Sequence, residues 1–148
     1  MEIKASRHIN APVDHVFDVF SDITRIEERI SGITKVEILS ETKSGVGTRW
    51  RETRVMFGQE ATEEMEISVF NVNRSYEVVA ASRGAEYHTV YNFSEENGGT
   101  RVDMVFSGKA VSFMAKLMSP LASLMSGATR KALEADMDEL KAICEQES

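Results

Sequence analysis

Hydrophobic and polar positions change their spacing several times along the first third of the chain. Over residues 2–9 the apolar side chains fall mainly on alternate positions, which is the period of a strand with one buried face. Pro12 then suits the first turn of a helix, and the apolar positions after it are three and four residues apart, as on an amphipathic helix. A second short helix over 23–30, ending near Gly32, and a strand over 33–42 are expected next.

Alternating segments separated by turn residues predict the rest of a sheet. Turns rich in glycine or asparagine separate four candidate strands, expected over residues 48–57, 60–70, 75–83 and 85–95. The run Asn97-Gly98-Gly99 marks a tight hairpin, because these residues tolerate the positive φ angles of such turns. A last strand over 100–109 should pair back. The short turns imply consecutive antiparallel pairing.

Beyond Gly108 the apolar positions recur at three- and four-residue spacing to the end of the chain. This pattern predicts one long C-terminal helix, which Pro120 should kink or divide. A sheet of seven antiparallel strands cannot leave its apolar face in water, and only this helix is long enough to cover it. The prediction is a single α+β domain over residues 1–148, a curved sheet around the C-terminal helix with two short helices after the first strand.

Composition and charge exclude several classes of protein. Apolar residues make up 42% of the chain and charged residues 28%, unlike a disordered or membrane protein. A formal net charge of −7 disfavours nucleic acid as a partner. The uncharged stretch 117–129 contains Pro120 and Gly127 and is too short to cross a bilayer. The chain starts without the apolar run of an export signal, and Cys144 is its single cysteine, so a cytoplasmic location is expected.

Four segments carry a resemblance to a known family. INAPVDHVFDVFSDI stands near the start, GVGTRW precedes the third strand, GGTRV follows the last turn and LKAICEQ ends the terminal helix. In this order of elements the chain resembles the START-like (SRPBCC) superfamily, and more narrowly its polyketide cyclase/dehydratase and lipid-transport branch. The resemblance covers essentially the whole chain. It implies a helix-grip fold with a cavity for a lipid, steroid, polyketide or other hydrophobic compound, in a superfamily where some members are enzymes and many only bind.

Alternation along the strands predicts which side chains face that cavity. Over 48–57, Trp50 and Met56 identify the inner face, which places Glu52 and Arg54 inside. Glu52 and Arg54 could orient the polar end of a ligand, or their charges could simply neutralise each other. The second interpretation, a structural ion pair, is favoured.

Other strands and the terminal helix are expected to complete the wall. On the strand 60–70, Met65, Ile67 and Val69 should face inward. Tyr87 and Tyr91 offer hydroxyls for a ligand oxygen, although closing the core is an open alternative. Methionines among small residues on the helix favour incomplete filling of the concave face. The predicted ligand-binding residues are Trp50, Glu52, Arg54, Met65, Tyr87, Tyr91, Met104, Phe106, Met118, Leu121 and Met125.

No metal or cofactor is expected. The three histidines lack metal-ligand spacing, His15 and His88 are expected on the solvent side, and no hydrolase, nucleotide or dinucleotide motif occurs. The predicted function is a carrier or sensor of a small hydrophobic molecule, with no catalysis. Two alternatives remain: a cyclase/dehydratase-type enzyme with Glu52 as its one candidate acid or base, and an interaction or stress-response module with a collapsed cavity.

Overall fold

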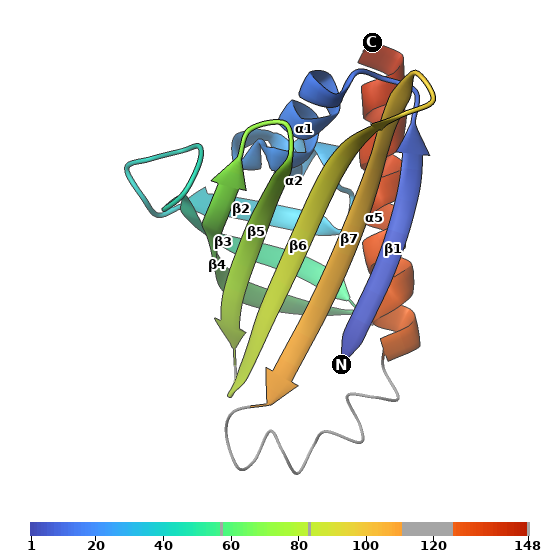
Figure 1. Ribbon diagram of the computed structural model, residues 1–148. Coiled ribbons are helices and arrows are strands. Elements are labelled where there is room, and N and C mark those ends of the chain that lie inside the picture. Colours follow the sequence, from blue (N-terminus) through green and yellow to red (C-terminus); the bar gives the residue numbers. More distant parts are fainter. Residues whose placement is uncertain (57, 83, 111–125, 148) are drawn as a thin grey trace.

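The computed structural model describes residues 1–56, 58–82, 84–110 and 126–147. Its elements are ordered as the sequence predicts, with three helical segments after the first strand and a long helix at the end (Figure 1). They are β1 (Glu2–Ile9), α1 (Val13–Ser21), η1 (Ile23–Arg25), α2 (Ile26–Arg29), β2 (Ile33–Ile38), β3 (Arg49–Met56), β4 (Gln59–Asn71), β5 (Ser75–Ser82), β6 (Ala85–Glu96), β7 (Gly99–Ala110) and α5 (Ser126–Glu147). The predicted kink at Pro120 falls in 111–125, outside the described residues.

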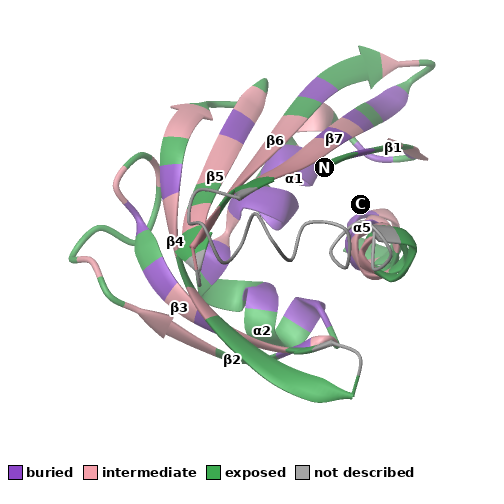
Figure 2. Cartoon of the chain, turned by 90° about the horizontal axis from the view of Figure 1, so that it is seen from below, coloured by how far each residue is buried: buried purple, intermediate pink, exposed green. Residues whose placement is uncertain are grey.

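The seven strands form one antiparallel sheet in the order β1-β7-β6-β5-β4-β3-β2. Consecutive strands from β2 to β7 are neighbours, joined by the loop 39–48 between β2 and β3 and by short turns after that, whereas β1 pairs with β7. Because β1 and β2 therefore lie at opposite edges, the chain between them crosses one end of the sheet, and α1 and α2 form that crossing. Figure 2 shows the sheet as an open curve, with α5 seen end-on at its opening beside β1.

Two of the early elements differ from the prediction by more than a terminal residue. The helix predicted over 23–30 is a turn of 3-10 helix, η1, followed by the short α2. The strand predicted over 33–42 ends at Ile38, because the side-chain oxygen of Ser40, rather than a main-chain carbonyl, accepts the hydrogen bond from the Arg49 amide at 2.9 Å. A side chain that replaces its own backbone in this way stops the strand ladder.

A β-bulge corrects the predicted inner face of β4. Ile67 pairs with Val78, but Val69 pairs with Glu77, so Ser68 is the extra residue on this strand. An extra residue reverses the alternation beyond it. Phe70 therefore packs against the core in place of Val69, and its ring lies 5.2 Å from that of Phe17 of α1.

The predicted hairpin between β6 and β7 is confirmed. Asn97 and Gly98 form the loop, with φ angles of 47° and 79°, and two positive φ angles in a two-residue loop are typical of the tight turn that matches strand twist. Gly99 follows at a close approach of two chain segments. A Cβ atom at this position would lie 2.4 Å from the carbonyl oxygen of Ile9, so only glycine fits here.

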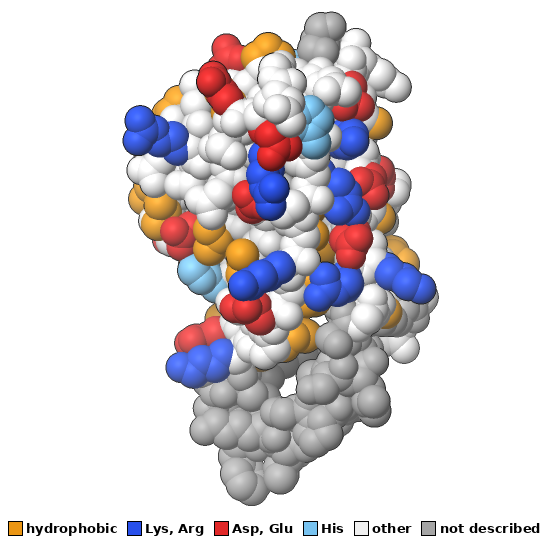
Figure 3. All heavy atoms as spheres, turned by 45° about the vertical axis from the view of Figure 1, so that its right-hand side comes forward, with side chains coloured by type: hydrophobic (Ala, Val, Ile, Leu, Met, Phe, Trp, Pro, Cys, Tyr) orange, Lys and Arg blue, Asp and Glu red, His pale blue; other side chains and the backbone are white. Residues whose placement is uncertain are grey.

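Polar contacts hold α5 against the edge of the sheet. Arg7 of β1 donates to Asp138 at 2.6 Å and to Glu134 at 3.0 Å, while Ser31, before β2, donates to Glu139 at 2.8 Å. Acidic and basic side chains are intermixed on the face that carries β1 and α5 (Figure 3). The helix packs mainly on β1, α1 and α2 rather than on the central strands. This placement leaves room over the middle of the concave face.

No helix in the described ranges is long and apolar enough to span a membrane.

Candidate ligand-binding cavity

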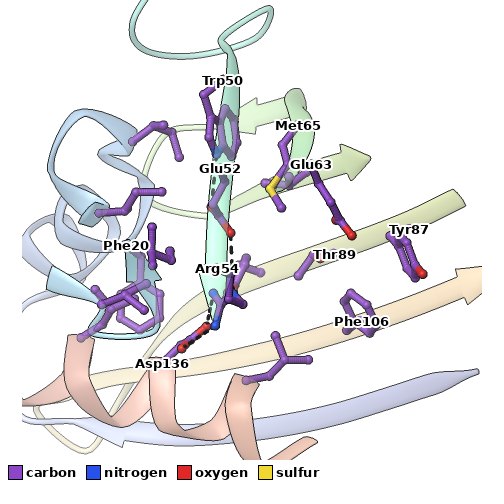
Figure 4. Close-up of a pocket in the computed structure, with 18 of the residues that line it drawn as sticks. Phe20, Trp50, Glu52, Arg54, Glu63, Met65, Tyr87, Thr89, Phe106 and Asp136 are labelled. Atoms are coloured by element: carbon purple, nitrogen blue, oxygen red, sulfur yellow. Dashed lines mark hydrogen bonds and ion pairs between the residues drawn. The ribbon is translucent and has the colours of Figure 1, made fainter. Parts of the chain in front are cut away.

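A cavity of about 370 Å³ lies between the concave face of the sheet and α5. Strands β3 to β7 form one wall, and apolar side chains of α5 and of the short helices form the others (Figure 4). Ile23 of η1, Ile26 of α2 and Ile30 just after α2 contribute, and their three- and four-residue spacing turns them to one side. Leu133 and Leu140 contribute from α5. Most of the wall is therefore aliphatic or aromatic.

A cluster of charged side chains interrupts this apolar wall. Arg54 of β3 binds Asp136 of α5 with two hydrogen bonds, at 2.7 Å from Nη2 and 3.1 Å from Nη1. Its Nε lies 3.8 Å from Glu52 Oε2, too far for a hydrogen bond. The indole N–H of Trp50 donates to Glu52 Oε1 at 3.3 Å. Figure 4 shows these four residues lying one after another along β3 and across to α5.

The cluster holds two carboxyl groups for one guanidinium, and both are removed from water. Burial raises the pKa of Glu52, and the charge of Arg54 and the bond from Trp50 oppose this only in part. Burial also raises the pKa of Asp136, against the hydrogen bonds and charge of Arg54. Because Asp136 holds both terminal nitrogens of Arg54, Glu52 is the acid with the weaker compensation. The predicted ion pair between Glu52 and Arg54 is present, at 3.8 Å, but the main partner of Arg54 is Asp136.

Asp136 was missed by sequence reasoning, although the sequence contains a signal for it. Leu133 and Leu140 mark the apolar stripe of α5, and Asp136 lies three residues after the first and four before the second. A carboxylate on the apolar stripe of a buried helix needs a partner. The inward-facing Arg54 could have supplied that partner.

Aromatic side chains of β5, β6 and β7 form the floor of the cavity. Tyr76, also missed by sequence reasoning, stacks on Tyr91 at 4.9 Å, and its hydroxyl donates to the Phe20 carbonyl at 3.0 Å. Tyr87 stacks on Phe106 at 5.7 Å. Burial and the charge of Asp136 raise the pKa of Tyr91, so its hydroxyl stays protonated and able to donate a hydrogen bond.

The structure brings most of the predicted residues to one place. Those that line the cavity are Trp50, Glu52, Arg54, Met65, Tyr87, Tyr91 and Phe106. Met104 does not line it. This side chain faces inward as expected but is 1% exposed and packs in the closed core. Met118, Leu121 and Met125 lie outside the described residues.

Two predictions about histidines have different outcomes. His88 lies on the outer face of β6 and bonds to Glu77 at 2.6 Å, so the prediction that it points away from the cavity is confirmed. The prediction that His15 faces solvent holds only in part, since 28% of its side chain is exposed. Its Nε2 is buried without a hydrogen-bond partner, 3.8 Å from Glu147 Oε2 at the end of α5. Among the described residues, no three His, Cys, Asp or Glu side chains gather as metal ligands would.

Solved structures of similar fold come from several bacteria. A protein from Thermus thermophilus, TTHA0849, is 19% identical, with a TM-score of 0.80 over 96% of this chain and 95% of that one. A START superfamily protein from Mycobacterium smegmatis is 13% identical, with a TM-score of 0.76 over 99% of both chains. The Zhui aromatase/cyclase from a Streptomyces species is 13% identical, with a TM-score of 0.78 over 99% of this chain and 94% of that one. These likenesses show the helix-grip fold.

Sequence comparison gives the family. No curated protein sequence matches the chain. The family described as polyketide cyclase / dehydrase and lipid transport matches over residues 1–145, which is nearly the whole length. With the curved sheet, the C-terminal helix and the cavity between them, this match shows that the chain belongs to the polyketide cyclase/dehydrase and lipid transport family.

Proposed function

We propose that this protein binds one small, largely apolar molecule in the cavity between sheet and α5, as a carrier or sensor. The observation that carries the proposal is the mainly apolar cavity of about 370 Å³, in which Glu52, Arg54 and Asp136 form one charged cluster. Small-molecule sites are typically cavities of roughly 300–1,000 Å³ with mainly apolar walls and a few polar groups. Each methylene that a ligand buries gains about 0.8 kcal/mol, so the walls supply affinity and the cluster supplies orientation.

Two alternatives weigh differently against this proposal. An interaction module with a collapsed cavity is disfavoured, because the volume between sheet and helix is open. A cyclase or dehydratase using the same cavity is the second candidate, and one observation favours it: Glu52 is a buried carboxyl with a raised pKa, as suits a proton donor. Structural relatives named as aromatase/cyclases add to its weight. If the protein is a dehydratase, a carbonyl compound recovered from its cavity would be the dehydrated product rather than the substrate.

Blocking the cavity is expected to abolish binding while the fold persists. Thr89 of β6 points into the cavity (Figure 4), and Thr89→Phe would fill part of it. The neutral fluorescent probe N-phenyl-1-naphthylamine should bind the unaltered protein saturably and bind the variant about tenfold or more weakly, since the variant removes volume that the probe needs. Emission of the probe and of Trp50, the single tryptophan and a lining residue, reports binding.

A matched control separates blocking from general damage. Thr62 faces outward on β4, between the lining residues Ala61 and Glu63, and bonds to Thr53 across the strands at 2.9 Å. Thr62→Phe adds the same side chain outside the cavity and should leave probe affinity unchanged. Equal binding by the Thr89 and Thr62 variants, or no saturable binding by the unaltered protein, would refute the proposed function. Circular dichroism confirms that both variants are folded.

A further inference from the structure

We infer that the cavity selects neutral molecules bearing a carbonyl or hydroxyl oxygen and rejects carboxylates such as free fatty acids. This inference rests on the proposed function, and it names the chemistry of the ligand that the cavity takes. It follows from the arrangement of the Glu52, Arg54 and Asp136 side chains.

The positive charge of Arg54 inside the cavity is already paired with carboxylates of the protein. Arg54 is the one lysine or arginine among the described residues that line it. Both terminal nitrogens of its guanidinium bind Asp136, at 2.7 and 3.1 Å, and its Nε faces Glu52 at 3.8 Å. These two parallel hydrogen bonds are the bidentate geometry in which arginine binds a carboxylate, and Asp136 already occupies it. A ligand carboxylate would therefore have to displace Asp136, which α5 holds in place.

A ligand carboxylate would also enter a site with an excess of acids. Two carboxyl groups face one guanidinium, and the side chains of Glu52, Asp136 and Arg54 are 7%, 11% and 17% exposed. A further anion would meet the negative charge of Asp136 in a medium that screens it weakly, and Glu52, whether protonated or ionised, supplies no positive charge to bind it. If the ligand carboxylate instead stayed in the cavity without a partner, the free energy of removing its charge from water would exceed what most single contacts contribute.

Hydrogen-bond donors for a neutral oxygen are present in the same wall. Tyr91 lines the cavity beside the cluster, and Thr89 adds a second hydroxyl from the same strand. Glu52 in its protonated form adds a carboxyl donor, and burial favours that form. The indole N–H of Trp50 donates to Glu52 Oε1 at 3.3 Å, so this bond does not occupy the proton of the carboxyl, which stays available to a ligand oxygen. A ketone, phenol or alcohol on an apolar body matches these groups.

A matched series of ligands with one carbon skeleton tests the inference. Dodecan-2-one, dodecanoate and dodecylamine are used to displace N-phenyl-1-naphthylamine at about pH 7, below the concentration at which they form micelles. We expect the ketone to displace the probe and dodecanoate to be weaker by about tenfold or more, the scale on which an unpaired buried charge lowers affinity. Equal or tighter binding of dodecanoate overturns the inference and leaves the proposed function intact, and tighter binding of the amine than of the ketone also overturns it.

Two variants show whether the cluster causes the selection. Asp136→Asn removes the charge that occupies Arg54, so the affinity ratio of ketone to dodecanoate should fall by about tenfold. Asp138→Asn removes the same charge two residues away on α5, where the side chain binds Arg7 outside the cavity and is 56% exposed, and the ratio should not change. An equal change in both variants overturns the inference. If Asp136→Asn does not fold, the ratio in the unaltered protein decides alone. Failure of the probe and all three ligands to bind contradicts the proposed function itself.

Discussion

Replacing Arg54 with methionine is expected to destabilise the protein by about 3–5 kcal/mol, the usual cost of removing one partner from a buried ion pair. The variant keeps an unbranched side chain and its packing but leaves Asp136 and Glu52 facing each other without a cation. Urea unfolding followed by the emission of Trp50, which is 2% exposed in the folded state, measures the change.

A double variant isolates the charge effect. Arg54→Met combined with Asp136→Leu replaces both partners by apolar side chains, which is often neutral for stability. The double variant should therefore recover most of the stability that Arg54→Met loses. A double variant as unstable as Arg54→Met alone would show that the guanidinium acts through packing and not through its charge.

The destabilisation by Arg54→Met should also depend on pH. Burial raises the folded-state pKa values of Glu52 and Asp136 above their ordinary values of 4.5 and 3.8. Below these pKa values both carboxyl groups are protonated in the folded and in the unfolded state, so their burial costs no stability. As pH rises through them, the unfolded chain releases protons that the folded protein retains, so stability falls until the folded-state pKa values are passed. Without Arg54 those values rise further. The deficit of the variant should be larger at about pH 7 than at about pH 4, and a deficit equal at both would contradict this account.

The single replacement of Trp50 with alanine is expected to lower the free energy of unfolding by about 3–5 kcal/mol. The indole is buried, it lines the cavity, and its N–H donates a hydrogen bond to Glu52 two residues along the same strand. Its loss removes apolar burial and merges the new space with the existing cavity. Because the variant has no tryptophan, circular dichroism during urea unfolding measures the change.

Trp50→Phe separates packing from hydrogen bonding. Phenylalanine retains most of the apolar surface and lacks the N–H, so the expected loss is about 1–2 kcal/mol, from one hydrogen bond and a small void. Equal losses in the alanine and phenylalanine variants would show that the hydrogen bond to Glu52, rather than burial of the ring, is the main role of Trp50.

Strand periodicity predicted the inner face of β3 correctly, because a strand with one buried face repeats every two residues without interruption. Trp50, Glu52 and Arg54 all line the cavity as expected. The same reasoning failed beyond Ile67, because the bulge at Ser68 leaves no mark in hydrophobicity when Val69 and Phe70 are both apolar. Periodicity finds the face of a regular strand, and it does not find the residue at which the strand becomes irregular.

The partner of Arg54 could not be identified from periodicity for a different reason. Asp136 lies 82 residues further along the chain, and its contact depends on how α5 crosses the sheet. Met104 illustrates the same limit. It faces inward, as a residue that lines the cavity would, but it is packed in the closed core, near where α1 and α5 cover one side of the sheet. Which side chains face inward follows from the strands, whereas which of them reach the cavity follows from the helix.

Native mass spectrometry of the purified protein, with organic extraction of whatever accompanies it, tests the central claim most directly. The account predicts one apolar molecule per chain, neutral and bearing oxygen, that is present in Thr62→Phe and absent from Thr89→Phe. A protein that is recovered empty and also fails to bind N-phenyl-1-naphthylamine or dodecan-2-one would contradict the claim that this cavity is a ligand site.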